Sequence, residues 1–143
     1  MSISKKTVLI TGCSDGGIGA SMAKILHEKG LEDVENLELK ATSKESIVRC
    51  AEVVRKRTGG TLDMLVNNAG RDFLIPLLDT DVEEAKMFFD VNFWSVLAVT
   101  QAFAPSRNPE VPSGKSGSTP IRGGKGVYNL LQPSKCFYYL PSN

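Results

Sequence analysis

The chain has 143 residues, a length that fits one domain, and its 41% hydrophobic and 23% charged residues are typical of a globular protein. Its net charge of +1 excludes an electrostatic basis for binding nucleic acid or an anionic membrane surface. The three cysteines, Cys13, Cys50 and Cys136, lack the spacing of a metal or redox site. We therefore expect no metal, and reduced thiols in a cytoplasmic setting.

The first expected element is a buried strand over the apolar run Val8-Leu9-Ile10, which is too short for a signal peptide. Four glycines follow it, at Gly12, Gly16, Gly17 and Gly19. Apolar residues then recur at helical spacing, at Ile18, Met22, Ile25 and Leu26. A strand, a glycine-rich turn and a helix form a phosphate site, because glycine permits close backbone approach and the helix start supplies free N–H groups.

The glycine turn is not a P-loop, which would need Lys and then Ser or Thr after its last glycine. A dinucleotide turn and a plain strand-to-helix connection remain. Thr11-Gly12 and Gly17-Ile18-Gly19 resemble the T-G-x-x-x-G-I-G turn of the short-chain dehydrogenase/reductase family, with one extra residue. The form T-G-C-S-D-G-G-I-G looks most like the fungal NADPH-dependent acyl-dihydroxyacetone-phosphate reductase branch. The resemblance implies an α/β fold with a Rossmann-type doubly wound parallel sheet, and cofactor contacts from Gly12, Ser14, Gly17, Ile18 and Gly19.

A second strand should follow the first helix, which we expect to end at Gly30. Either Leu37 to Ala41, with its alternating apolar residues, is that strand, or the second strand is missing and this is the third. The family comparison favours the latter, because residues 39–43 line up with the family's L-D-V-T and Lys40 replaces the Asp that neighbours adenine. If Leu37 to Ala41 is instead the second strand, Lys40 stands where NAD enzymes place an acid for the ribose hydroxyl, and a lysine there would prefer a 2′-phosphate. Both interpretations lack an NAD-selecting acid, so we favour NADP(H) over NAD(H).

Thr42 and Glu45 form a capping-box pattern for the next helix, which Gly59-Gly60 ends. Another apolar strand, Leu62 to Val66, precedes Asn67-Asn68-Ala69-Gly70. In a doubly wound sheet this strand lies beside the first, at the point where dinucleotides bind. The sequence N-N-A-G can be a mere turn, but it is also a family signature, and the resemblance implies cofactor contacts from Asn68, Ala69 and Gly70.

A third helix should follow the capping-box pattern of Thr80 and Glu83. Its apolar stretch, Met87 to Phe103, suggests burial on more than one side and is too polar for a membrane span. In the family the matching helix packs in the subunit interface, so the resemblance implies a homo-oligomer through this helix. Asp90-Val91-Asn92 matches the family motif whose Asn supports the active site, although Asn92 can equally be an ordinary buried polar residue.

The resemblance covers residues 5–104 and then stops. The family continues with a Ser on a strand and Tyr-x-x-x-Lys on a helix, where the Tyr donates a proton to the carbonyl and the Lys lowers its pKa and holds the ribose. No such Tyr-x-x-x-Lys occurs, because Tyr128, Tyr138 and Tyr139 are followed four residues later by Gln132, Ser142 and Asn143. Val127-Tyr128-Asn129 with Ser134-Lys135 is similar to the family's Y-N-A-S-K, but Pro133 intervenes and the Tyr–Lys spacing is too long.

Composition divides the chain at the same point. Residues 105–143 hold six of the seven prolines and a single acidic residue, Glu110. We expect residues 1–104 to form the front half of a dinucleotide-binding domain and residues 105–143 to be a disordered tail. The strand Leu62 to Val66 should then be an unpaired sheet edge.

The function implied by the resemblance is that of an oxidoreductase. The parent reaction is NADPH-dependent reduction of a small carbonyl substrate, including acyl-dihydroxyacetone phosphate, in the cytoplasm or, for the parent branch, at the endoplasmic reticulum or lipid droplet surface. Because the acid–base pair is missing, we expect little or no turnover. The alternatives are a non-catalytic fragment that binds nucleotide or pairs with an intact homologue, and an unstable product of an altered transcript.

Overall fold

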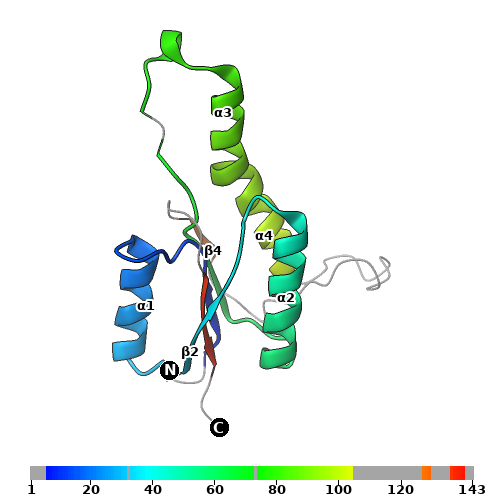
Figure 1. Cartoon of the computed structure of the whole chain (residues 1–143). Helices are drawn as coiled ribbons and strands as arrows, with labels where there is room; N and C mark the ends of the chain where they lie inside the picture. Colours follow the sequence, from blue (N-terminus) through cyan, green and yellow to red (C-terminus); the bar gives the residue numbers. More distant parts are fainter. Residues whose placement is uncertain (1–5, 32, 73, 105–126, 130–135, 141–143) are drawn as a thin grey trace.

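The computed structural model describes residues 6–31, 33–72, 74–104, 127–129 and 136–140. In chain order its elements are β1 (Val8–Ile10), α1 (Ile18–Glu28), β2 (Asp33–Leu37), α2 (Lys44–Thr58), β3 (Met64–Asn67), a 3-10 turn (Leu77–Asp79), α3 (Val82–Phe89), a π-helical turn (Asp90–Trp94), α4 (Ser95–Phe103), β4 (Val127–Asn129) and β5 (Cys136–Leu140). Helix α1 covers one face of the sheet, and α2 and α4 cover the other (Figure 1). The expected α/β class with a parallel sheet is confirmed.

The side chains of β1 point alternately to the two faces of the sheet, so the strand contributes to a hydrophobic core on each face. Val8 and Ile10 pack with Ala23 and Leu31 on the side of α1. Leu9 instead joins the core under α2 and α4, which includes Leu39, Ile47, Cys50, Ala51, Val54, Leu62, Leu65, Val99 and Phe103. Each large side chain buried there contributes roughly 1.5–3 kcal/mol, so burial on both faces holds this short sheet together.

Two helix caps differ from the expected capping boxes by one residue. Ser43, not Thr42, caps α2, because its hydroxyl accepts a hydrogen bond from the Ser46 N–H at 3.2 Å. Asp81, not Thr80, caps α3, and its carboxylate accepts from two backbone N–H groups of the first turn. Both helices therefore begin one residue later, while Gly59 ends α2 as expected with a positive φ of 65°.

The strand order is β2-β5-β1-β3-β4. β1 runs parallel to β3, and β3 runs parallel to β4, whereas β5 is antiparallel to both β1 and β2. The predicted strand over Leu37 to Ala41 is wrong in its bounds: the strand ends at Leu37, and Leu39 leaves the sheet to enter the core under α2. Since β2 lies two places from β1, it holds the position of a third strand in the usual 3-2-1-4 order, which favours the interpretation that the second strand is missing.

Two strands come from the predicted tail. β5 fills the place of the missing second strand, and β4 pairs with β3. The expectation of an unpaired edge at Leu62 to Val66 is therefore wrong, because β4 pairs with β3. The expectation of a disordered tail stays a prediction. The remainder of the tail lies outside the described residues, and the boundary at residue 104 stays a prediction.

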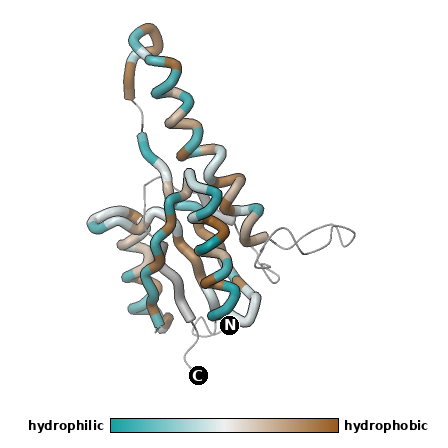
Figure 2. Tube along the Cα trace, turned by 45° about the vertical axis from the view of Figure 1, so that its right-hand side comes forward, coloured by the Kyte–Doolittle hydropathy of each residue, from teal (hydrophilic) through white to brown (hydrophobic). Residues whose placement is uncertain are grey.

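Residues 74–94, which precede α4, project away from the sheet (Figure 1), and we call them the helical arm. Leu74, Leu77 and Leu78 near its free end are 99%, 87% and 98% exposed. Phe89, Phe93 and Trp94 are each 55% exposed, so the expected burial of this helix on more than one side is wrong along the arm. Apolar segments therefore face solvent along it (Figure 2).

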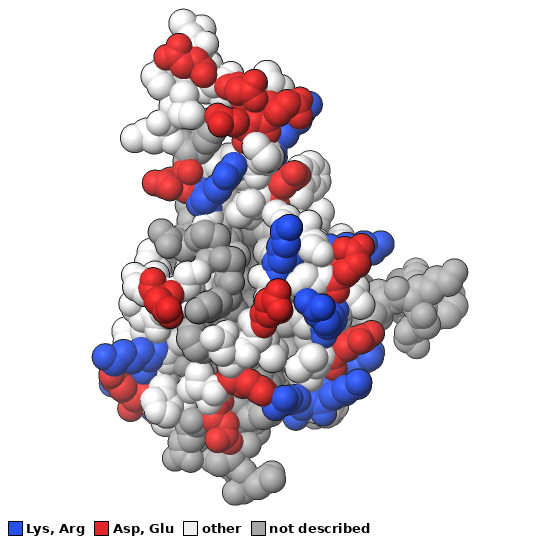
Figure 3. All heavy atoms as spheres, viewed as in Figure 1, with Lys and Arg blue, Asp and Glu red and all other residues white. Residues whose placement is uncertain are grey.

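On the face drawn in Figure 3, Lys and Arg lie among Asp and Glu, so no large area carries charge of a single sign. Acidic residues gather at the free end of the arm. Among the described residues, no helix is long and apolar enough to cross a membrane.

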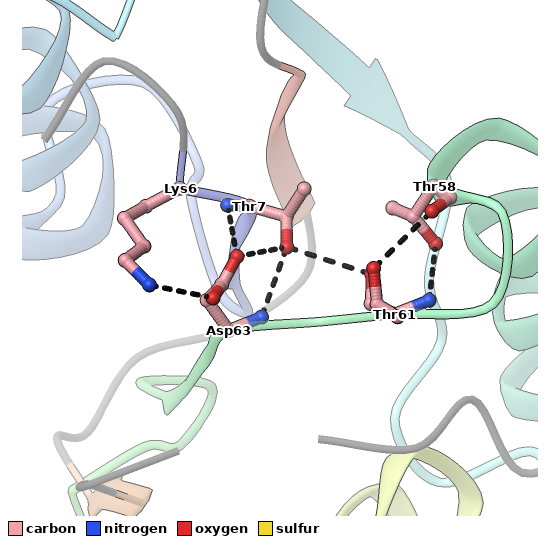
Figure 4. A network of polar contacts seen from close by, with 5 residues as sticks. All are labelled: Lys6, Thr7, Thr58, Thr61 and Asp63. Atoms are coloured by element: carbon pink, nitrogen blue, oxygen red, sulfur yellow. Dashed lines mark hydrogen bonds and ion pairs between the residues drawn. The ribbon is translucent and has the colours of Figure 1, made fainter. Parts of the chain in front are cut away.

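A polar network ties the starts of β1 and β3 together (Figure 4). The Asp63 carboxylate accepts hydrogen bonds from the Thr7 N–H and hydroxyl, each at 2.9 Å, and from the Lys6 ammonium at 3.0 Å. The Thr7 hydroxyl oxygen in turn accepts from the Asp63 N–H at 2.9 Å. The network fixes the two parallel strands at the edge opposite their carboxyl ends.

We expect Asp63 to make stability depend on pH in acid. Burial raises the pKa of this carboxyl, but the hydrogen bonds from Thr7 and Lys6 outweigh it and lower the pKa below its ordinary value of 3.8. A lowered folded-state pKa stabilises the fold above the unfolded pKa, and this contribution is lost as pH falls through the folded pKa. D63N should reduce the free energy of unfolding at pH 7 by roughly 1–3 kcal/mol and flatten its acid dependence, as measured by urea unfolding. D72N, at an exposed residue, is the control, and an equal loss in both variants would contradict the prediction.

Candidate functional site

The candidate site lies where β1 and β3 end side by side. Ile10 pairs with Val66, so Thr11-Gly12 and the segment Asn67 to Gly70 leave the sheet next to each other. Thr11 joins them: its N–H donates to the Val66 carbonyl at 2.9 Å, and its hydroxyl accepts from the N–H groups of Asn68 at 3.0 Å and Ala69 at 2.9 Å. The two predicted cofactor segments therefore form one unit.

Asn68 fastens the glycine turn to β3. Its side-chain amide donates to the carbonyl oxygens of Thr11 at 2.8 Å and Gly12 at 2.7 Å. The residue is fully buried, and its Oδ1 has no hydrogen-bond partner within the described part of the chain. A buried acceptor without a donor has a free energy cost.

Gly19 lets the start of α1 approach this unit. A Cβ at this position would lie 2.5 Å from Asn68 Nδ2, 2.8 Å from the Gly12 oxygen and 2.9 Å from Cys13 Sγ. Gly12 itself has a φ of 71°, in the left-handed region that favours glycine. Two of the predicted glycines are thus required by the geometry of the turn.

The N-terminus of α1 is open to an anion. Gly17 is its N-cap, no side chain accepts a cap hydrogen bond there, and no acidic residue stands in the first turn. Free N–H groups and the positive end of the helix dipole therefore face outward beside the turn. Ile18 is 52% exposed and Ser14 is half-buried, so these predicted contacts lie at the mouth of the turn.

Asn92 holds the segment that follows Gly70 against the helical arm. Its Oδ1 accepts from the Arg71 N–H at 2.8 Å, and its Nδ2 donates to the Arg71 carbonyl at 2.7 Å. Both ends of the side-chain amide are therefore engaged with backbone. The supporting catalytic role that the resemblance implies for Asn92 remains a prediction.

Two residues of this unit were not predicted as site residues. Thr11 bonds both predicted segments, and Asn67 donates to the Thr100 hydroxyl at 3.0 Å, which joins β3 to α4. A hydroxyl directly before the first glycine and a carboxamide at the end of a buried strand are the sequence signals that could have found them.

The described carboxyls whose pKa is shifted lie away from this unit. The two described carboxyls with a shifted pKa are Asp63, at the opposite edge of the sheet, and Glu45, whose pKa is lowered by backbone and Ser43 hydrogen bonds at the start of α2. The side chains of Tyr128, Tyr138 and Tyr139 lie outside the described residues. Within the described ranges, no cluster of three His, Cys, Asp or Glu side chains could hold a metal.

A cavity of about 510 Å³ lies between α2 and the stretch that runs from the end of the helical arm through α4. Its lining includes Lys44, Ile47, Asp90, Trp94 and Ala98. It contains none of the residues of the glycine turn or of Asn67 to Gly70, so the candidate site is defined by the backbone turn and not by this cavity.

Residues 6–118 match the family model described as enoyl-(acyl carrier protein) reductase. The chain is 52% identical over 118 residues to the short-chain dehydrogenase cctT of Talaromyces islandicus, covering 70% of this chain and 42% of that protein. It is 35% identical over 116 residues to the NADPH-dependent 1-acyldihydroxyacetone phosphate reductase of Schizosaccharomyces pombe, covering 69% and 39%. The ligand-free structure of Thermoplasma acidophilum aldohexose dehydrogenase has the same fold, with a TM-score of 0.56, 20% identity, and coverage of 69% and 43%.

The family-model match begins with the predicted resemblance but runs to residue 118, beyond the predicted end at residue 104. The chain spans 42–44% of the length of the first relatives it matches. The family signature in the turn after β1 and the one after β3 lie together, as the resemblance implied. The chain belongs to the short-chain dehydrogenase/reductase family.

Proposed function

We propose that the unit formed by the turns after β1 and β3 binds a nicotinamide dinucleotide, with its pyrophosphate at the N-terminus of α1. The observation that carries this is the contact between Gly19, Asn68 and Gly12, which leaves no room for a Cβ beneath the turn. The uncapped helix fits the same ligand, which offers an anion.

Each predicted contact residue has a distinct task in this proposal. Gly12, Gly17 and Gly19 admit the pyrophosphate to the backbone, Ser14 and Ile18 flank it, and Asn68, Ala69 and Gly70 border the ribose and nicotinamide. When bound, the dinucleotide supplies the hydride for carbonyl reduction. The chain's own residues bind and orient it, with Thr11 and Asn68 keeping the two turns in register.

We favour NADP(H) over NAD(H). Lys40 is exposed just beyond the end of β2, and its N–H is fixed by the Ser46 hydroxyl at 2.9 Å. Lys40 is not an acid, whereas NAD selection uses an acid that bonds the ribose hydroxyl. The similar Schizosaccharomyces pombe protein is named as an NADPH-dependent reductase, which supports the same preference.

We assign the parent reaction as reduction of a carbonyl such as acyl-dihydroxyacetone phosphate, and we expect little or no turnover from this chain. It lacks Tyr-x-x-x-Lys, so the proton that must reach the carbonyl oxygen has no donor of the family type. The cytoplasm, or for the parent branch the endoplasmic reticulum or lipid droplet surface, remains the predicted location.

Titration of the purified chain with NADPH and separately with NADH, followed by nicotinamide fluorescence, tests this function. We expect saturable binding that is tighter for NADPH, and no oxidation of NADPH when a carbonyl substrate is added. Absence of binding by a sample whose far-UV circular dichroism shows the fold would contradict dinucleotide binding. Substrate-dependent turnover would contradict the proposed inactivity.

A second function, pairing with a copy of itself or an intact homologue through the Met87 to Phe103 helix, is favoured by apolar exposure. Met87, Phe93 and Trp94 are each at least half exposed. We expect light scattering to show a dimer that F93E weakens by at least about tenfold, because a charge would be buried at the contact. L78E, on the arm but outside that helix, is the control. Equal masses for the wild type and F93E would contradict pairing through this helix.

A further inference from the structure

Strand β5 lies inside the sheet and pairs on both sides. Phe137, Tyr138 and Tyr139 stand opposite Ile10, Leu9 and Val8. On its other side, all five residues of β5 stand opposite all five of β2. One segment far along the chain therefore satisfies the facing backbone groups of two strands, in antiparallel orientation to both.

Strand β2 depends on β5 for its place in the sheet. It is an edge strand, and β5 is its neighbour in the strand order. Asp33, Val34 and Asn36 are exposed, whereas Leu37 packs against the core under α2 and Glu35 pairs with Arg57 at 2.6 Å. Without β5, β1 and β2 would face each other across a slot one strand wide, and each would present unpaired N–H and C=O groups.

The residues of β5, Cys-Phe-Tyr-Tyr-Leu, carry no formal charge and favour extended backbone. β5 follows β4, which lies at the far edge of the sheet beyond β3. The same strand supplied by another copy would form the identical ladder in the slot. Exchange therefore preserves both backbone ladders of β5, and protein concentration decides how much of it occurs.

We propose that the slot between β1 and β2 accepts β5 from a second copy of this chain, giving a dimer with reciprocally exchanged strands in equilibrium with the closed chain. This contact is separate from the helical arm. It does not rest on dinucleotide binding, since it uses only the backbone ladders of β1, β2 and β5.

The register supplies a direct test, because Leu37 stands opposite Cys136. The double variant L37C/C136S carries a cysteine in β2 but none in β5, while the wild type carries Cys136. Directly opposite residues in an antiparallel pair have Cα atoms about 4.5–5.5 Å apart, which suits a disulfide. Mixed and oxidised, the two chains should form a covalent heterodimer whose yield rises with concentration.

The matched control is N36C/C136S, whose new cysteine stands opposite Phe137, one position out of register. Its heterodimer yield should be lower by roughly tenfold or more. Cys13 and Cys50 are buried and are present in every chain, so they do not distinguish the mixtures.

The single variant L37C, which keeps Cys136, shows whether β5 pairs with β2 of its own chain, because an internal disulfide can then form. An internal disulfide in L37C with no heterodimer in the mixture at any concentration overturns the proposal, because β5 then stays in its own chain. No disulfide of either kind in folded protein overturns it as well, because β5 then does not occupy the slot. If circular dichroism shows that L37C is unfolded, V34C mixed with Y139C tests the same ladder, since Val34 stands opposite Tyr139.

Discussion

The variant G19A should bind NADPH at least about tenfold more weakly than the wild type, a loss of roughly 1.4 kcal/mol or more. The added methyl group would lie 2.5 Å from Asn68 Nδ2 and 2.8 Å from the Gly12 oxygen, closer than atoms in van der Waals contact. Either the Asn68 amide leaves its two carbonyl partners or α1 moves away from the turn. Both changes displace the N–H groups proposed to hold the pyrophosphate. Isothermal titration calorimetry measures the effect.

The control for this variant is S21A, on the exposed side of α1 and one turn below Gly17. The Ser21 hydroxyl bonds only the Gly17 carbonyl among the described contacts, so its removal should leave NADPH affinity within about twofold. An unchanged affinity in folded G19A would show that the ligand does not use the turn. A loss of affinity in S21A as large as that in G19A would show instead that α1 as a whole is fragile.

The variant F103A should lower the free energy of unfolding by about 3–5 kcal/mol, enough to unfold much of a marginally stable chain. Phe103 is fully buried at the end of α4, where it packs in the core that includes Leu9, Val54 and Leu65. Removing its ring leaves a cavity among residues from the sheet and from α2. Chemical unfolding followed by circular dichroism measures the loss.

Phe89 offers the matched comparison, since it is also a helical phenylalanine but is 55% exposed on the arm. F89A should cost less than about 1 kcal/mol, because less apolar area returns to water and no cavity forms. Similar losses in F89A and F103A would mean that the core under α2 does not carry the stability we attribute to it.

The parts of the fold that the sequence predicts are those set by local pattern. Val8–Ile10 is a strand because an apolar run stands between lysines and a glycine turn, and Gly59 ends α2 because only a left-handed residue suits that position. The strand predicted over Leu37 to Ala41 was wrong in its bounds because two structures give the same alternation of apolar residues. One is a strand, and the other is a segment that leaves the sheet and buries its apolar side chains in the core. β5 could not be predicted, because its partners in β2 and β1 lie roughly 100 to 130 residues earlier in the chain.

In the candidate site too, features set by local sequence pattern could be predicted, whereas features set by long-range packing could not. The glycines and N-N-A-G identify both turns because each is a short contiguous signal. The hydrogen bonds of Thr11, which join the turns across 57 residues of sequence, need the parallel pairing of β1 and β3 before they can be seen. The orphaned Asn68 oxygen is likewise a property of packing, since no motif states which acceptors a folded chain leaves without a donor.

The central place of β5 has a consequence for the order of folding. During synthesis, β1, β2 and β3 leave the ribosome long before residues 136–140, so one edge of β1 has no partner for most of translation. Closing the sheet requires contacts between residues more than a hundred positions apart, a separation that slows folding. Chaperones that recognise extended apolar segments would thus meet this chain before its last strand arrives, and the yield of native protein would depend on how long they hold it.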